Sequence, residues 1–258
     1  MEGKHIKMKI ITFINEKGGV GKTSACFNTA WELSNRGKKI LMIDIDGQKA
    51  NLTFFTGIER PNNMKTIIDV LRNGTALKDC IVPVKENLDL LPANASVASI
   101  GMDSKVSQFR SELGSVKEIY DYIFIDVTPS PGWGHYLALC VSDYAVIVML
   151  PDVTSLEGDT GILDSIMEVQ ETTNPKLKIA GFLFNRNYDR TNLGREVLEV
   201  ADRLATHAKT KVFTTKIPQA IALGECVARH QGVTDYAPNS KAADVFREFA
   251  NELETEIL

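Results

Sequence analysis

The sequence predicts an α/β fold in which a mostly parallel, twisted sheet carries helices on both of its faces. Short apolar runs alternate along the chain with segments of helical spacing, which is typical of parallel strands joined by right-handed crossovers. One run, YAVIVML at residues 144–150, is apolar throughout, as a strand covered on both faces requires. The chain has 258 residues, and 44% are apolar, which is enough to bury such a sheet in one domain. We expect this single domain to span residues 1–258, with residues 1–8 as a short flexible lead-in.

The expected elements follow one another in a regular order. Strands are predicted at residues 10–14, 39–46, 122–126, 144–150 and 177–184, and helical spacing is found at residues 25–33, 133–141 and 154–173. The stretch 57–63 is polar enough to be a surface loop. The tail, residues 241–258, repeats Phe246, Phe249, Leu253 and Ile257 at helical spacing.

The first strand leads into a glycine-rich loop, residues 15–23, which reads NEKGGVGKT. A strand before it and a helix after it are the context that a phosphate-binding loop requires, and a chance glycine turn needs neither. The glycines let backbone N–H groups turn inward around an anion, and the start of the next helix adds partial positive charge. Lys22 would then reach the β- and γ-phosphates of a nucleotide, and the Thr23 hydroxyl would bind Mg²⁺. The residues expected to line this loop around the nucleotide are Gly18, Gly19, Val20, Gly21, Lys22, Thr23 and Ser24.

Carboxylates end two of the predicted strands. Asp44 and Asp46 close the run KILMIDID, and Asp126 closes the run YIFID. The carboxyl ends of parallel strands lie at the edge of the sheet where ligands bind. Asp126 suits the Walker B role of holding Mg²⁺, directly or through water, and Asp44 suits the orientation of the water that attacks the γ-phosphate. Asp46 has a second interpretation, as a cap of the turn or helix that follows.

Four segments together resemble the ParA family of partition ATPases, within the deviant-Walker group that includes MinD. They are KGGVGKT at residues 17–23, LMIDIDGQKANLT at 41–53, FIDVTPSP at 124–131 and DYAPNSKAADVF at 235–246. The likeness extends over nearly the whole chain. It implies a P-loop NTPase that hydrolyses ATP with Mg²⁺, weakly alone and faster when a partner protein stimulates it.

The resemblance also assigns roles to residues. In the family the lysine at the front of the loop, here Lys17, reaches across a dimer to the partner's ATP, so that two monomers enclose two nucleotides. Lys17, Lys22 and Asp44 would then form the catalytic group. The segment GFLFNRNYDR at residues 181–190 resembles the one whose Asn contacts the base, which is Asn185 here. The segment IPQ at residues 217–219 resembles the strand end against the adenine, which places Pro218 and Gln219 in the pocket.

DNA binding has weaker support in the sequence. The net charge of −4 provides no general attraction to DNA, and Gln219 and Ala222 stand where relatives often have basic residues that help to hold it. Taken alone, the basic residues from 186 to 216 fit a solvated helix face with pairs such as Glu199 with Arg203. With the resemblance they become candidates for ATP-dependent, sequence-independent DNA binding, since a dimer would double them. These candidates are Arg186, Arg190, Arg195, Arg203, Lys209, Lys211 and Lys216.

The main alternative is a membrane-cycling or protein-cargo positioning ATPase of the MinD type. Membrane binding of that kind needs a basic amphipathic helix, whereas the tail from residue 241 to 258 has five acidic residues against Lys241 and Arg247. We therefore interpret its apolar stripe as core packing. A metabolic ligase or kinase on the same scaffold is a third interpretation, for which the sequence has no substrate motif.

Further expectations concern the surroundings of the protein. The sequence has no signal-like start and no apolar run of about 18 residues, so we predict a cytoplasmic protein without membrane contact. The resemblance implies association with the nucleoid in the ATP-bound state and a separate centromere-binding partner of the ParB type. The loop begins after residue 14, which leaves no room for a preceding helix-turn-helix domain.

The four cysteines are predicted to be buried thiols, because Cys26, Cys80, Cys140 and Cys226 are far apart and form no C-x-x-C pair.

Overall fold

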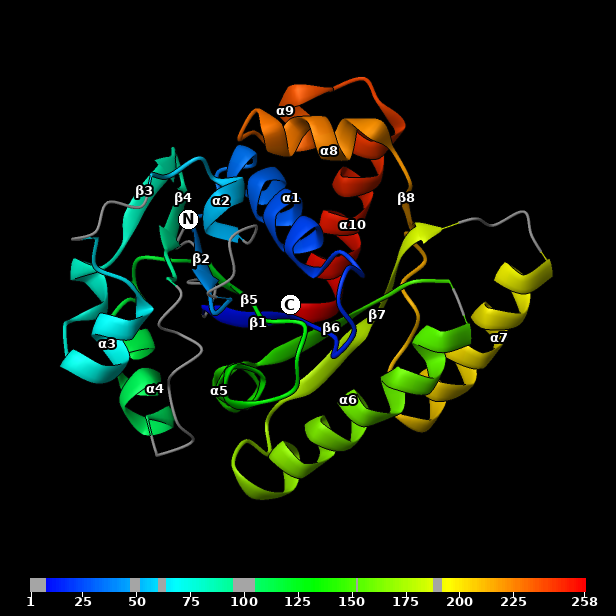
Figure 1. Ribbon diagram of the computed structural model, residues 1–258, viewed down its shortest axis with the longest axis horizontal. Helices are drawn as coiled ribbons and strands as arrows, with labels where there is room; N and C mark the ends of the chain where they lie inside the picture. The colour runs from blue at the N-terminus through cyan, green and yellow to red at the C-terminus, as the bar shows by residue number, and fades with distance from the viewer. Residues whose placement is uncertain (1–7, 47–51, 60–63, 95–104, 152, 188–191) are drawn as a thin grey trace, which may run out of the picture.

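The computed structural model describes residues 8–46, 52–59, 64–94, 105–151, 153–187 and 192–258. In these residues one eight-stranded sheet runs in the order β3-β4-β2-β5-β1-β6-β7-β8 (Figure 1). Its strands are β1 (Lys9–Ile14), β2 (Ile40–Asp44), β3 (Val82–Lys85), β4 (Leu88–Leu91), β5 (Tyr122–Asp126), β6 (Tyr144–Met149), β7 (Lys178–Asn187) and β8 (Ile217–Pro218). All neighbouring strands are parallel except β3, which pairs with β4 in the antiparallel direction. The predicted mostly parallel sheet is confirmed.

Helices cover both faces of this sheet (Figure 1). The helical segments are α1 (Lys22–Asn35), α2 (Leu52–Phe55), α3 (Ile67–Asn73), the short 3₁₀ turn η1 (Leu77–Asp79), α4 (Val106–Gly114), α5 (Trp133–Val141), α6 (Val153–Thr172), α7 (Asn192–His207), α8 (Ile221–Ala228), α9 (Val233–Tyr236) and α10 (Lys241–Ile257). Within the described part of the chain, no helix is both long and apolar enough to cross a membrane.

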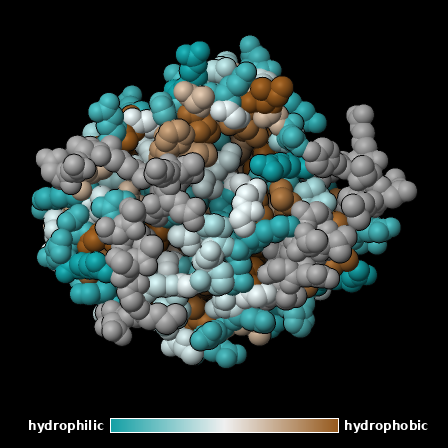
Figure 2. All heavy atoms as spheres, in the orientation of Figure 1, coloured by the Kyte–Doolittle hydropathy of each residue, from teal (hydrophilic) through white to brown (hydrophobic). Residues whose placement is uncertain are grey.

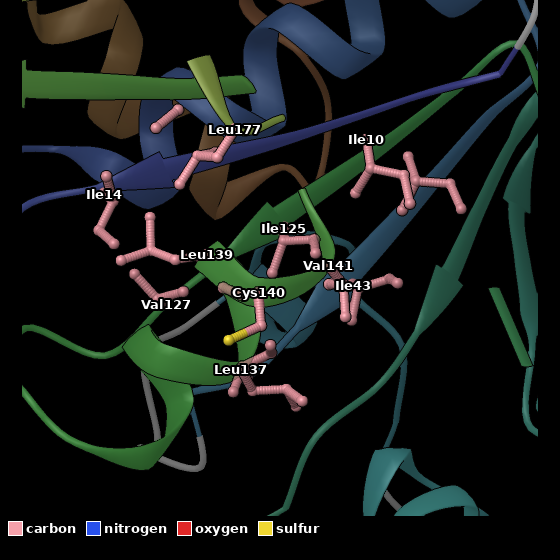
Figure 3. Close-up of a cluster of buried hydrophobic side chains, with 14 of the residues drawn as sticks. Ile10, Ile14, Ile43, Ile125, Val127, Leu137, Leu139, Cys140, Val141 and Leu177 are labelled. Carbon is pink, nitrogen blue, oxygen red and sulfur yellow. The ribbon is translucent and has the colours of Figure 1, made fainter. Parts of the chain in front are cut away.

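Two apolar cores lie on opposite faces of the sheet, because successive side chains of a strand point to opposite sides. On β1, Ile10 and Ile14 pack into the core beneath α5, which Figure 3 shows in close-up. Ile11 and Phe13 alternate with them and pack into the second core, which contains residues of α1 and α10. This burial on both faces accounts for the uninterrupted apolar runs of the central strands.

The C-terminal helix α10 lays its apolar stripe into the second core. Phe246, Phe249, Leu253 and Ile257 are all buried there. Ser240 caps the N-terminus of the helix, and its hydroxyl accepts a hydrogen bond from the backbone N–H of Ala243 at 3.2 Å. The prediction that this stripe packs in the core is confirmed. The four cysteines are also buried and free, as expected.

The structure differs from the predicted elements mainly between residues 52 and 114. There the chain forms α2, α3, η1, β3, β4 and α4, all of them short and none predicted. Strand β7 also continues to Asn187, beyond the predicted end at residue 184, because β8 pairs with Asn185 and Asn187. The predicted surface loop 57–63 lies outside the described residues from residue 60 onward, and so does most of the predicted lead-in.

Candidate nucleotide-binding site

Three strands end side by side at the edge of the sheet where the glycine-rich loop begins. β5 lies between β2 and β1, and its last residue, Asp126, is in register with Asp44 on one side and with Phe13 on the other. The loop follows β1 and leads directly into α1. The loop and the two predicted carboxylates therefore meet at one edge, as parallel strands require.

The loop is held open by glycine geometry and by one asparagine. Gly19 and Gly21 have φ angles of +73° and +95°, which side chains rarely adopt, and a Cβ on Gly21 would overlap the amide of Asn185. Asn15 donates from Nδ2 to the carbonyl of Val148 at 2.8 Å and accepts the backbone N–H of Lys17 at 2.7 Å. Asn15 thus fixes the start of the loop to β6, a role that its place in the motif did not indicate.

Lys22 is buried at the start of α1. Its ammonium donates to the carbonyl of Lys17 at 3.1 Å, across the loop, and the residue is 5% exposed. Burial lowers the pKa of Lys22, while Asp126 and Asp46 oppose the shift. An anion bound in the loop would favour the charged form of this lysine. Lys17 itself lies half-buried at the front of the loop.

Asp44 is fully buried and held by several hydrogen bonds. Its Oδ2 accepts from the backbone N–H of Thr53 at 2.9 Å and from the Thr53 hydroxyl, and its Oδ1 accepts from the N–H of Asp46 at 2.8 Å. Burial raises the pKa of Asp44 to about 7, although the bonds from Thr53 and Asp46 favour the charged form. Sequence reasoning missed Thr53, because its contact with Asp44 depends on how α2 returns to the end of β2.

Asp126 provides two buried carboxylate oxygens at the end of β5. Neither carboxylate oxygen has a hydrogen-bond partner among the residues that the structure describes, and the side chain is 0% exposed. Burial, and then the charge of Asp44, raise the pKa of Asp126 well above its usual range, while Thr23 and Lys22 oppose the shift. Unpartnered carboxylate oxygens of this kind fit a hard cation such as Mg²⁺, which binds proteins through one or two carboxylates and otherwise through phosphates and water.

A cavity of about 540 Å³ opens beside the loop, between α2, α8 and the ends of β7 and β8. Gly21, Ser24, Asn185, Pro218 and Gln219 are among its lining residues, so the structure brings the predicted base-contacting residues together. Asn185 also donates from Nδ2 to the carbonyl of Val20 at 2.7 Å, which ties the cavity wall to the loop. Apolar residues gather near the outer edge of this region, over α8 (Figure 2). A second, larger cavity of about 1030 Å³ lies where β1 begins and contains none of the predicted site residues.

The described members of the predicted DNA-binding set are spread over β7, α7 and the segment before β8 rather than gathered in one cluster. Arg186 lies in the last part of β7 and lines the cavity, whereas Lys211 lies beside Phe182 on the same strand. Lys209 is close to the beginning of β7, roughly 20 Å from Arg186 at about 3.3 Å per strand residue. Lys211 forms an ion pair with Glu256 at 2.8 Å.

The structure places the side chains of two of the remaining four candidates. Arg203 is exposed on α7, and Lys216 is half-buried just before β8. Arg190 lies outside the described residues, as does the side chain of Arg195. Among the members whose side chains the structure describes, Arg203 and Lys209 are the exposed ones away from the cavity.

Comparison with known proteins identifies relatives over most of the chain. Residues 8–179 match the AAA domain family. The sporulation initiation inhibitor protein Soj of Bacillus subtilis is 35% identical over 251 residues, which cover 95% of this chain and 98% of Soj. The chromosome-partitioning ATPase Soj of Thermus thermophilus is 30% identical over 249 residues, which cover 96% of each chain.

Solved structures share the fold over the same length. MinD, the septum site-determining protein of Pyrococcus horikoshii complexed with Mg-ADP, aligns with a TM-score of 0.78 at 26% identity and covers 96% of both chains. Cobyrinic acid a,c-diamide synthase from Mycobacterium smegmatis, with a bound ATP analog and magnesium, aligns at 0.79 and 26% identity, covering 95% of this chain and 93% of that one. McdA from Cyanothece aligns at 0.86 but with 18% identity, covering 96% and 99%, and so shows the fold alone.

Proposed function

The chain belongs to the ParA/MinD family of P-loop ATPases, and from this premise we propose that it is a partition ATPase that cycles between an ATP-bound dimer and monomers. The dimer binds DNA without sequence preference, and a separate centromere-binding protein of the ParB type stimulates hydrolysis and releases it. The observation that carries this proposal is the front lysine of the loop, Lys17, in a chain 35% identical to Soj. The site of action would be the cytoplasm, with the ATP-bound form on the nucleoid.

Each residue of the site has a distinct task in this proposal. The loop from Gly18 to Ser24 surrounds the phosphates with backbone N–H groups, and Lys22 neutralises the β- and γ-phosphates. Thr23 and Asp126 would hold Mg²⁺, which would supply charge neutralisation between the phosphate oxygens. Asp44, held by Thr53 and Asp46, orients the attacking water. Asn185, Pro218 and Gln219 line the cavity in which the base is bound.

The trans role of Lys17 is tested by dimerisation. We expect the parent protein to form a dimer with ATP in light scattering, and Lys17→Ala to stay monomeric while it still binds ATP. The loss is large because each dimer contains two such lysines, and each charge-assisted contact contributes about 1.5–3 kcal/mol. Lys117→Ala, which removes the same charge from an exposed side chain far from the loop, should dimerise like the parent. An ATP dimer of Lys17→Ala at parental strength would contradict the assignment.

DNA binding is tested by its dependence on ATP and on salt. We expect binding to require ATP, to ignore sequence, and to weaken steeply as salt rises, because it depends on the release of counterions from phosphates. Arg195→Ala and Arg203→Ala should each flatten the plot of log affinity against log salt by about 1. Lys211→Ala should have a smaller effect, since Glu256 already pairs with that lysine. Lys78→Ala, on η1, is the matched control. Binding without ATP, or variants that match the control, would point to another surface.

The alternative, a positioning ATPase of the MinD type, differs in what the dimer binds. Its membrane-cycling version needs a free amphipathic helix, whereas the apolar stripe of α10 is buried in the core. Its protein-cargo version fits the same nucleotide site. Binding of the ATP form to vesicles of anionic lipid, in the absence of DNA binding, would favour the membrane version. Binding of the ATP form to a protein complex in place of DNA would favour the protein-cargo version.

A further inference from the structure

His135 is a buried histidine in the first turn of α5 to which neither the sequence motifs nor the proposed function assign a role. The residue is 3% exposed, and its Nε2 lies 2.6 Å from the carbonyl oxygen of Thr128. Its other ring nitrogen, Nδ1, is buried and has no hydrogen-bond partner among the described residues. Three side-chain atoms in the described part of the chain share this condition, and the other two are the carboxylate oxygens of Asp126.

The contact with Thr128 determines which nitrogen carries the proton. A carbonyl oxygen can only accept a hydrogen bond, so Nε2 must donate and Nδ1 is left as an acceptor in the neutral ring. Burial, with a smaller contribution from Lys22, lowers the pKa of His135 to about 4, although the bond to Thr128 opposes the shift. The ring is therefore neutral near pH 7, and its donor is committed to Thr128.

Thr128 belongs to the segment that joins the Mg²⁺-binding candidate to α5. It lies two residues after Asp126, and its hydroxyl donates to the carbonyl of Ser130 at 3.0 Å, which closes a turn. The next residue, Pro129, lies against the phosphate loop, since its Cβ is 3.5 Å from the place where a side chain on Gly18 would begin. The hydrogen bond from His135 thus holds the segment 127–132 where it contacts the loop.

The N-terminal end of α5 packs closely against the residue that follows β2. A Cβ on Gly134 would lie 3.0 Å from the side chain of Ile45, so the helix start rests against the residue that follows β2. Ile45 in turn donates its backbone N–H to the carbonyl of Asp126 at 2.9 Å. His135 therefore extends from a helix start that packs against Ile45 to a segment that also contacts the phosphate loop through Pro129 and the core through Val127.

We propose that His135 is a positioning residue that holds the segment 127–132 over the phosphate loop and couples nucleotide binding to α5. This inference rests on the proposed function, because it assumes that a nucleotide occupies the loop. When a nucleotide shifts Pro129, the hydrogen bond from Nε2 to Thr128 transmits the movement to the first turn of α5. If His135 only filled space, no hydrogen-bond donor would be needed at this position. An apolar side chain of similar size would then serve equally well.

The start of α5 contains its own reporter, Trp133. The chain has two tryptophans, and the other, Trp31, donates from its indole N–H to Asp235, at a distance from this segment. In a Trp31→Phe background the emission of Trp133 can be followed during titration with ADP and Mg²⁺ and with a non-hydrolysable ATP analogue. Nucleotide binding is measured separately with a fluorescent ADP. Trp31→Phe alone is first compared with the parent in that binding assay.

We expect His135→Gln to behave like the background, because a glutamine amide nitrogen reaches nearly the position of Nε2 and can donate to Thr128. His135→Leu keeps the volume and removes the donor. It should lose most of the emission change of Trp133 and slow ATP turnover by about tenfold, with ADP affinity within about threefold. The rescue by Gln and the separation of turnover from binding are results that simple core packing would not produce.

The proposal is overturned if His135→Leu retains the full Trp133 response and the parental rate, or if His135→Gln is as impaired as His135→Leu. Failure of the proposed function gives a different result. If the background protein binds no adenine nucleotide in the direct assay, the assumption about the loop is wrong whatever the histidine does. If nucleotide binds but DNA does not, the His135 result still stands, because none of its measurements involves DNA.

Discussion

Lys22→Ala is expected to abolish measurable ATP and ADP binding. Lys22 is the buried cation of the loop, and its ammonium lies across the loop at the carbonyl of Lys17. Without it, only Mg²⁺ and the backbone N–H groups of the loop would balance the charge of the phosphates beside the carboxylates of Asp44 and Asp126. Loss of charge-assisted hydrogen bonds to phosphates, at about 1.5–3 kcal/mol each, predicts affinity at least about 100-fold weaker. Isothermal titration calorimetry with Mg-ADP measures this directly.

The control for Lys22→Ala must separate lost binding from lost folding. Lys39→Ala removes a lysine from an exposed position just before β2 and should bind nucleotide like the parent. Thermal melting without nucleotide should show that Lys22→Ala is folded. Burial lowers the pKa of Lys22, which means that the buried ammonium is unfavourable in the folded protein, so its removal should not destabilise the fold strongly. Affinity within about threefold of the parent would mean that the loop binds phosphate mainly through its backbone, and that Lys22 has another role.

The strands and the loop could be predicted because their signals are local. An apolar run such as residues 122–126 is buried on both faces wherever it lies in the sheet, and the structure confirms its bounds. The loop combines glycines, lysine and threonine within one short segment, so its geometry needs no distant residue to be recognised. Asp44 and Asp126 could be placed together because parallel strands end at the same edge.

The residues that sequence reasoning missed act through contacts between distant segments. Thr53 contacts Asp44 from α2, and Asn15 contacts Val148 on the neighbouring strand β6, although nothing in the adjacent sequence of either residue indicates it. His135 is part of an apolar helix and becomes notable only when its Nδ1 proves to be buried without a partner among the described residues. The DNA-binding set stays a prediction, and its described members are spread along β7, α7 and the segment before β8 rather than gathered in one place.

Asp44→Ala is expected to separate nucleotide binding from hydrolysis. The Asp44 carboxylate is held by Thr53 and Asp46 and does not itself bind phosphate in our proposal, so ATP affinity should stay within about threefold of the parent. Loss of the water-orienting group should slow turnover by about 100-fold or more. The variant should therefore accumulate as an ATP-bound dimer, which phosphate release and light scattering together detect. Asp44→Asn keeps the volume and some of the hydrogen bonds, and so tests whether the charge itself is needed.

The pH dependence makes this last prediction specific to Asp44. Burial raises the pKa of Asp44 to about 7, so the carboxylate form needed for hydrolysis is gained as pH rises through that value, and turnover should rise with it and then level. The free energy of unfolding should change with pH in the opposite direction to turnover. Because the folded protein holds this proton more tightly than the unfolded chain, whose Asp pKa is about 3.9, the nucleotide-free protein should lose stability between about pH 4 and pH 7. Asp44→Asn should have a smaller loss of stability over that window and no rise in turnover. Hydrolysis at the parental rate by Asp44→Ala, with DNA and a stimulating partner present, would show that another group orients the water.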